Sequence, residues 1–211
     1  MKKSSFKFEV KIPSAWKTLI EDYTDTTWWK YFQTISNNET LFSNLKLIEP
    51  NNVRVIMLSD IFYNDLKVSS QAMKQFVHEL CNQMEFTHST TVQESAILSR
   101  LSNEGVLYLN TSAYSLAEND RIHYRMLVAA LLNRLIEKNK NIITIAFGGS
   151  NIQLINEISK TTTYSINNII TVGHPSPRAT TSNFVGSNCF REVNNKLIEK
   201  GMFPIRYHII F

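Results

Sequence analysis

Polar residues that can bind a ligand or hold charge follow four apolar runs of the sequence. They form the turns Ser59-Asp60, Asn110-Thr111, Gly148-Gly149-Ser150 and Gly173-His174-Pro175-Ser176. Their side chains offer a carboxylate, an amide edge and an imidazole. Each also has a structural interpretation, because Asp and Asn at a strand end often cap the next helix or turn, and a histidine can be a satisfied turn residue.

The apolar runs indicate the elements that position these turns. Short strands are predicted at 53–58, 106–109, 142–147 and 166–172, and helices at 14–32, 71–86, 123–138, 150–158 and 187–200. Alternation of this kind predicts an α/β fold, here a single domain over 1–211 with a central, roughly four-stranded parallel sheet flanked by helices. Ligand sites in such folds lie at the carboxyl ends of the strands, so the candidates for chemistry are expected from these four turns.

The remaining motifs give weaker signals. Gly148-Gly149-Ser150 can cradle an anion on helix N–H groups, but it lacks the lysine of a P-loop and a plain turn is the simpler interpretation. His78-Glu79 has no second histidine at metal-binding spacing, so we expect neither metal nor cofactor. Trp28-Trp29 is either an interface patch or a buried helix face.

Composition limits the class of protein. The chain has 211 residues, 43% of them hydrophobic, with a net charge of +4 and a pI near 9.0, which is compatible with a nucleic-acid partner. The two cysteines, Cys81 and Cys189, favour reduced thiols. No run reaches the roughly 18 apolar residues of a membrane span, and the N-terminus lacks the apolar region of a signal peptide. We therefore expect a cytoplasmic monomer with no membrane partner.

An ordered set of motifs resembles family-1 uracil-DNA glycosylases over nearly the whole chain. The set comprises Ser14-Ala15-Trp16-Lys17, the strand 105–110 that ends in Asn110, Phe147-Gly148, the turn His174-Pro175-Ser176-Pro177, the helix start at 183–190, and Pro204-Ile205. The resemblance implies the fold of that family. It also implies an activity, in which deoxyuridine is flipped out of DNA and its base is cleaved from the sugar without a metal.

The resemblance assigns roles residue by residue. Asp60 would position water and stabilise the cationic sugar, and His174 would hydrogen-bond the departing uracil anion. Asn110 would read the uracil edge, with Ser59 and Phe62 also in the base-binding loop. Contacts to the DNA backbone would come from Ser150, Ser176 and Arg178, the last of which stands where the family has a wedge leucine.

Several positions depart from the family pattern. Leu58 replaces a glycine, and its Cβ is expected to intrude on the ligand. Phe62 stands in place of a methyl-excluding tyrosine, unless an inserted residue brings Tyr63 there. The stretch 64–70 is short and has neither the stacking phenylalanine nor the prolines of the family, and Phe76 is expected in the core. Stacking on an aromatic contributes roughly 1–3 kcal/mol per base, so a flipped base would lose support.

These departures favour a pseudoenzyme with little or no base-excision activity. Such a protein would bind single- or double-stranded DNA, or a DNA-mimicking glycosylase inhibitor protein for which it would act as a decoy or regulator. The alternative is a divergent active glycosylase that acts on uracil or another altered base through Asp60, Asn110 and His174. A third hypothesis is a different hydrolase that uses the same cleft.

Overall fold

The computed structural model describes residues 12–32, 44–60, 71–85, 94–112, 117–176 and 183–210. Its centre is a sheet of β1 (Val55–Ser59), β2 (Val106–Asn110), β3 (Ile143–Phe147) and β4 (Ile169–Val172). The strands are parallel and lie in the order β2-β1-β3-β4. The predicted α/β fold with a four-stranded parallel sheet is therefore confirmed.

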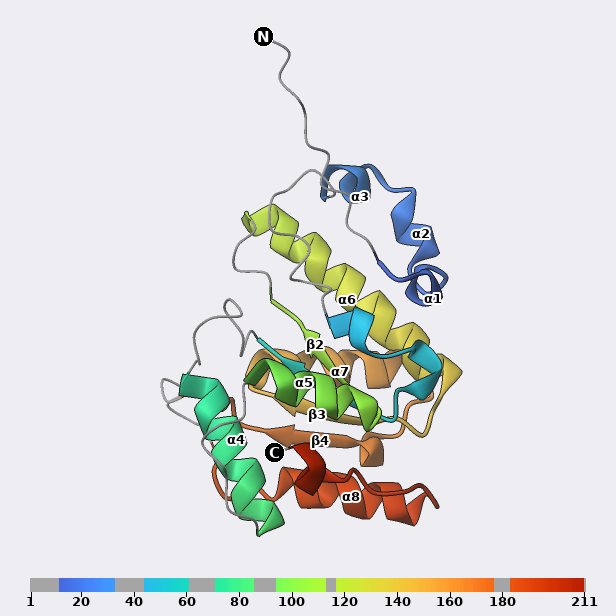
Figure 1. Cartoon of the computed structure of the whole chain (residues 1–211). Helices are drawn as coiled ribbons and strands as arrows, with labels where there is room; N and C mark the ends of the chain where they lie inside the picture. The colour runs from blue at the N-terminus through green and yellow to red at the C-terminus, as the bar shows by residue number, and fades with distance from the viewer. Residues whose placement is uncertain are drawn as a thin grey trace.

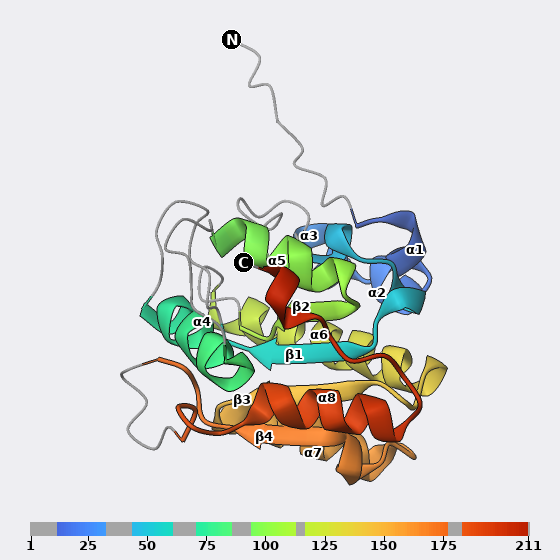
Figure 2. The same ribbon diagram turned by 60° about the horizontal axis from the view of Figure 1, so that its bottom comes forward.

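Helices cover both faces of the sheet (Figures 1 and 2). Helices α6 (Glu118–Lys138) and α7 (Gly149–Thr161) share one apolar cluster with Ile56 and Leu58 of β1. Helices α4 (Gln71–Met84), α5 (Glu94–Asn103) and α8 (Cys189–Glu199) share the other with Val55 and Met57. Alternate side chains of one strand thus enter opposite cores, as a sheet buried on both faces requires. None of the helices in the described ranges is long and apolar enough to cross a membrane.

Two helical predictions need correction. The expected helix at 14–32 is three short helices, α1 (Ser14–Lys17), α2 (Glu21–Thr24) and α3 (Thr27–Phe32). The break before α3 has a local cause, because the Thr26 hydroxyl accepts a hydrogen bond from the Trp29 N–H at 3.1 Å and so caps a new helix. Helix α5 was not predicted at all. Phe76 is buried, as predicted, and so is Trp29, while the Trp28 side chain lies outside what the structure describes.

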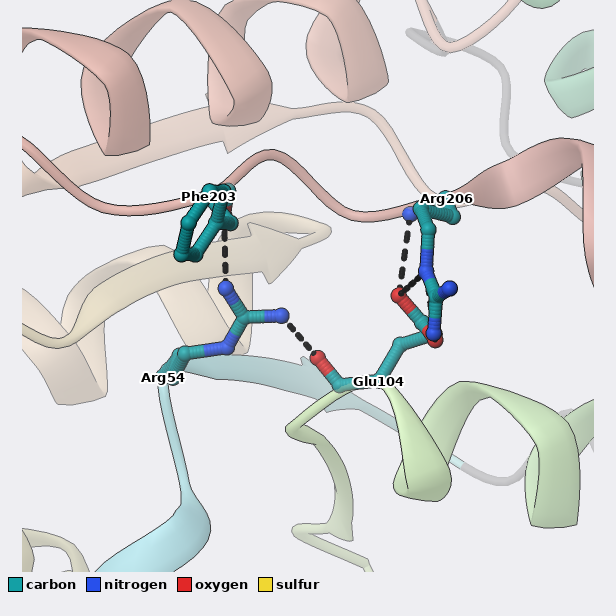
Figure 3. Close-up of polar contacts among 4 residues, drawn as sticks. All are labelled: Arg54, Glu104, Phe203 and Arg206. Atoms are coloured by element: carbon teal, nitrogen blue, oxygen red, sulfur yellow. Dashed lines mark hydrogen bonds and ion pairs between the residues drawn. The ribbon is translucent and has the colours of Figure 1, made fainter.

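An arginine ties the chain together at the amino edge of the sheet (Figure 3). Arg54 donates to the carbonyls of Phe203, at 2.6 Å, and Glu104, at 2.5 Å. The Glu104 carboxylate, only 5% exposed, pairs with Arg206 at 2.7 Å. The start of β1, the turn before β2 and the C-terminal segment are thereby joined. A hollow of about 580 Å³ also opens at this edge, lined by Lys46, Arg54, Glu104 and their neighbours, on the side away from the strands' carboxyl ends.

The ion pair predicts a pH-dependent contribution to stability. Hydrogen bonding to Arg206 lowers the pKa of Glu104 below its ordinary value. A carboxyl group whose pKa is lowered by folding stabilises the folded state at pH values above its pKa in the unfolded chain, which is about 4.3. This contribution is lost as the pH falls through the pKa in the folded state. Glu104→Gln should lower the free energy of unfolding by about 1 kcal/mol at pH 7, and the difference from the unsubstituted protein should shrink in acid.

Urea denaturation at pH 7 and pH 3 measures that difference. Glu85→Gln is the matched control, because Glu85 pairs with Arg191 on the surface, where the carboxylate side chain is 80% exposed, and it should change little at either pH. A Glu104→Gln effect of equal size at both pH values would contradict the assignment.

Candidate active site

The four polar turns meet at the carboxyl edge of the sheet. Ser59 is in register with Asn110, and the Thr111 N–H donates to the Ser59 carbonyl at 3.1 Å. On the other side, the Gly148 N–H donates to the Val172 carbonyl at 2.9 Å. Because the turns continue adjacent parallel strands, residues far apart in the sequence become neighbours here.

Asp60 connects these turns through its carboxylate. Its Oδ1 accepts hydrogen bonds from Ser112 Oγ at 2.8 Å, Thr111 Oγ1 at 2.9 Å and Asn151 Nδ2 at 3.3 Å. Over the ranges that the structure describes, no donor bonds the second oxygen, Oδ2. The carboxylate is thus held by one oxygen and presents the other.

Asn110 is anchored in a defined orientation. Its Oδ1 accepts the Ser112 N–H at 3.0 Å, and its main-chain carbonyl accepts the Tyr124 hydroxyl at 2.9 Å. Burial raises the pKa of Tyr124, which keeps that hydroxyl a neutral donor. A main-chain N–H can only face the oxygen of the amide, so the Nδ2 group must point the other way. Within the described part of the chain, no acceptor bonds that Nδ2 group.

His174 joins the site with a fixed tautomer. The Ser176 N–H donates to Nδ1 at 3.0 Å, so in the neutral ring the proton resides on Nε2. That Nε2 lies 3.2 Å from the main-chain carbonyl of Asp60, to which it donates. The turn is held from behind, because the Gly173 N–H donates to Asn183 Oδ1 at 2.9 Å.

Two residues at the end of β1 lie differently from expectation. Leu58 is fully buried in the core cluster beneath α6 and α7, so the prediction that its Cβ intrudes on a ligand is wrong. The alternation of β1 turns that side chain away from the edge. Ser59 is also fully buried, and its Oγ donates to the Asp60 carbonyl at 3.1 Å, which commits the hydroxyl to the turn.

Ser150 is hydrogen-bonded to an arginine that was not identified from the sequence. Arg125, from α6, donates to Ser150 Oγ at 2.8 Å and to its carbonyl at 2.7 Å. Ser150 is exposed in the first turn of α7, and Ser176 is half-buried in the histidine turn. A guanidinium and two serines therefore lie around the edge that holds Asp60 and His174.

Solved structures of other proteins have a fold similar to that of this chain. A mimivirus UNG variant crystallised in complex with UGI superposes with a TM-score of 0.72 at 13% identity, over 94% of this chain and 89% of that one. The mimivirus uracil-DNA glycosylase gives 0.69 at 16% identity, over 92% and 86%. The chain has the uracil-DNA glycosylase fold.

A sequence relative agrees with the fold. The uracil-DNA glycosylase of Sulfurimonas denitrificans is 28% identical over 140 residues, which cover 62% of this chain and 60% of the relative's own length. The match thus spans less than two thirds of the relative. No protein-family model matches the chain.

Some predicted positions lie outside the described residues. Phe62 and Arg178 are among them, as is the stretch 64–70 that would carry the stacking wall of a uracil-DNA glycosylase fold. The prediction that base stacking is lost in this chain therefore stays a prediction.

Other site residues were missed because sequence spacing does not reveal them. Ser112 and Asn151 received no role, and Thr111 was noted only as part of a turn, yet all three donate to Asp60. The available signal was a pair of hydroxyl residues directly after Asn110 and an amide in the first turn of α7. Arg125 lies in the predicted helix at 123–138, and an arginine in an amphipathic helix gives no indication of a functional role.

The close packing of Gly148 on His174 can be tested by substitution. Its φ is +82°, and a Cβ there would lie 3.3 Å from the His174 Cβ. Gly148→Ala should lower the free energy of unfolding by roughly 1–2 kcal/mol, because an L-residue is strained in that conformation, and should shift the imidazole resonances of His174.

Denaturation and long-range ¹H–¹⁵N spectra of the histidine ring provide the measurements. Gly149→Ala is the control, since nothing lies within 4 Å of its added Cβ and the position is helical, so stability should hold or rise. Equal behaviour of the two variants would argue against a close packing of Gly148 on His174.

Proposed function

We propose that this protein is an active DNA glycosylase that hydrolyses the N-glycosidic bond of deoxyuridine flipped out of DNA. The observation that carries the proposal is the convergence of Asp60, Asn110 and His174 at one edge, each with its orientation fixed by hydrogen bonds. The uracil-DNA glycosylase fold and the Sulfurimonas denitrificans relative support the same substrate class.

Asn110 provides base recognition in this proposal. The Nδ2 group can donate to the O4 carbonyl of uracil, while Oδ1, which still has a lone pair, can accept the adjacent N3–H. Cytosine has the reverse pattern, with an amino donor and a ring-nitrogen acceptor. Because the Ser112 N–H prevents the amide from turning over, the site would favour uracil over cytosine.

Asp60 and His174 provide the chemistry. As the glycosidic bond breaks, its electron pair goes to the base and positive charge develops on the sugar, which the Asp60 carboxylate would stabilise while Oδ2 orients the attacking water. The Nε2–H of His174 would leave the Asp60 carbonyl and donate to the O2 of the departing uracil anion. Water adds to C1′ of the sugar, and its proton passes to the solvent or the base.

The surroundings of the site suit a nucleic-acid backbone. Arg125 places a guanidinium on exposed Ser150 at the start of α7, and the chain carries a net charge of +4. Such contacts position the duplex without reading sequence. DNA binding should weaken as salt rises, in proportion to the number of phosphates contacted.

The pseudoenzyme hypothesis remains the second candidate. It is favoured by the sequence of 64–70, which lacks the stacking phenylalanine and the prolines expected for a base-stacking loop and lies outside the described residues. One of its original supports is gone, because Leu58 points into the core. An excision assay separates the two hypotheses directly.

Oligonucleotides with a single uracil should be cleaved at that position after incubation with the protein and treatment with alkali. Asp60→Asn and His174→Leu should each lower the excision rate by about 10²–10³-fold, since each removes a group that stabilises developing charge. Matching oligonucleotides with cytosine or thymine should stay intact.

Asp25→Asn and His208→Leu are the controls, since both residues are exposed and neither belongs to the site. Both should excise at the rate of the unsubstituted protein. A folded, DNA-binding protein that yields no abasic site would favour the pseudoenzyme instead.

UGI gives an independent test of the surface. We expect UGI to bind this chain, because the UNG variant crystallised with it superposes on 94% of the residues here. An equimolar amount should block excision and should co-elute with the protein in size-exclusion chromatography. Full activity with excess UGI, and separate elution, would show that the edge has diverged from that of the mimivirus protein.

A further inference from the structure

The hydrogen bonds on the Asp60 carboxylate come from two other turns of the edge. Thr111 and Ser112 follow β2, and Asn151 lies in the first turn of α7, after β3. All of them reach the same oxygen, Oδ1, at 2.8–3.3 Å. Donors from two separate elements fix the carboxylate both in rotation and in distance from the sheet.

Asn151 uses its whole amide for this purpose. It is fully buried, and its Nδ2 donates to the Phe147 carbonyl at 2.8 Å as well as to Asp60. Its Oδ1 lies within hydrogen-bond distance of the Thr111 hydroxyl. The bond to Phe147 is local to the strand-to-helix turn and the others cross to neighbouring turns, so the amide cannot rotate without breaking several contacts.

Thr111 is the branch point of the arrangement. Its Oγ1 lies within hydrogen-bond distance of both Asn151 Oδ1 and Asp60 Oδ1, but a hydroxyl has a single proton to donate. The side chain is 2% exposed, so water cannot readily take over either contact. Asn151, Thr111 and Asp60 therefore form one coupled unit.

We propose that Thr111, Ser112 and Asn151 are positioning residues that hold the Asp60 carboxylate with Oδ1 engaged and Oδ2 directed to water and the sugar. This inference rests on the proposed function, which it deepens by naming the residues through which Asp60 acts. With Oδ1 fixed by these donors, the carboxylate enters the reaction in one orientation. A misplacement of about 1 Å can cost roughly 10²-fold in rate.

A purely structural role is the competing explanation, since partly buried carboxylates require hydrogen bonds in any protein. The two explanations differ in where a substitution acts. A purely structural role predicts a loss of stability but an unchanged excision rate of the folded protein, whereas a positioning residue lowers that rate as long as the Asp60 carboxylate is present.

The test measures single-turnover excision of uracil in two backgrounds, the natural one and Asp60→Ala. Ser112→Ala and Thr111→Val should each lower the rate by about 10–100-fold in the natural background and have no further effect in Asp60→Ala. Thr111→Ser, which keeps the hydroxyl, should restore most of the rate. The Kd for DNA should not change, and Ser159→Ala, whose hydroxyl bonds only within α7, should behave as the unsubstituted protein.

A double-mutant cycle on stability tests the contact between Ser112 and Asp60 without a measurement of activity. Urea denaturation of Ser112→Ala, Asp60→Ala and the double variant should show a non-additive effect, because the residues contact each other. Additive stabilities, or an equal loss of excision in both backgrounds, would overturn the positioning role. If the unsubstituted protein excises no uracil, the proposed function fails, and the cycle still shows whether these residues hold Asp60.

Discussion

Asp60 is hydrogen-bonded to each of the other three turns at the carboxyl edge of the sheet. Its carboxylate accepts hydrogen bonds from Thr111 and Ser112, in the turn after β2, and from Asn151, in the turn after β3. Its main-chain carbonyl accepts a hydrogen bond from His174, in the turn after β4. A carboxylate withdrawn from water is costly unless donors surround it. That constraint draws the turns together, and the geometry of the whole site follows from it.

Contacts elsewhere in the molecule also hold the turns that Asp60 connects. Glu79 of α4, 2% exposed, accepts the Gly186 N–H at 2.8 Å, and Gln83 accepts the Phe190 N–H at 2.8 Å, so a helix on one face fixes the start of α8 and the residues just before it. At the opposite edge, Arg54 joins β1 to the turn before β2 and to the C-terminal segment. Both ends of the strands are therefore cross-linked by polar groups, and the apolar layers between them carry the packing.

The sequence allowed the sheet and its four turns to be predicted, because buried parallel strands are continuous apolar runs and their carboxyl ends carry the polar residues. It did not reveal which donors reach Asp60, since that depends on the register of Ser59 with Asn110 and on the way Gly148 leads β3 into α7. The expected intrusion of Leu58 failed for a related reason. A glycine-to-leucine change looks severe in an alignment, but the side chain enters the core when strand alternation turns it inward.

The distribution of satisfied and unsatisfied polar atoms bears on whether the site is functional. If the network only supported the fold, its strongest polar groups would be expected to find partners within the chain. Across the described residues, Asp60 Oδ1, Asn110 Oδ1 and His174 Nδ1 all have such partners. In the part of the chain that the structure describes, Asp60 Oδ2 and Asn110 Nδ2 have none, and the His174 Nε2–H is held by a carbonyl at 3.2 Å, which a base oxygen could replace. In the proposed function, the atoms left available would serve as an acceptor for water, a donor for a base carbonyl and a donor for a leaving anion, which are the groups that N-glycosidic hydrolysis would use.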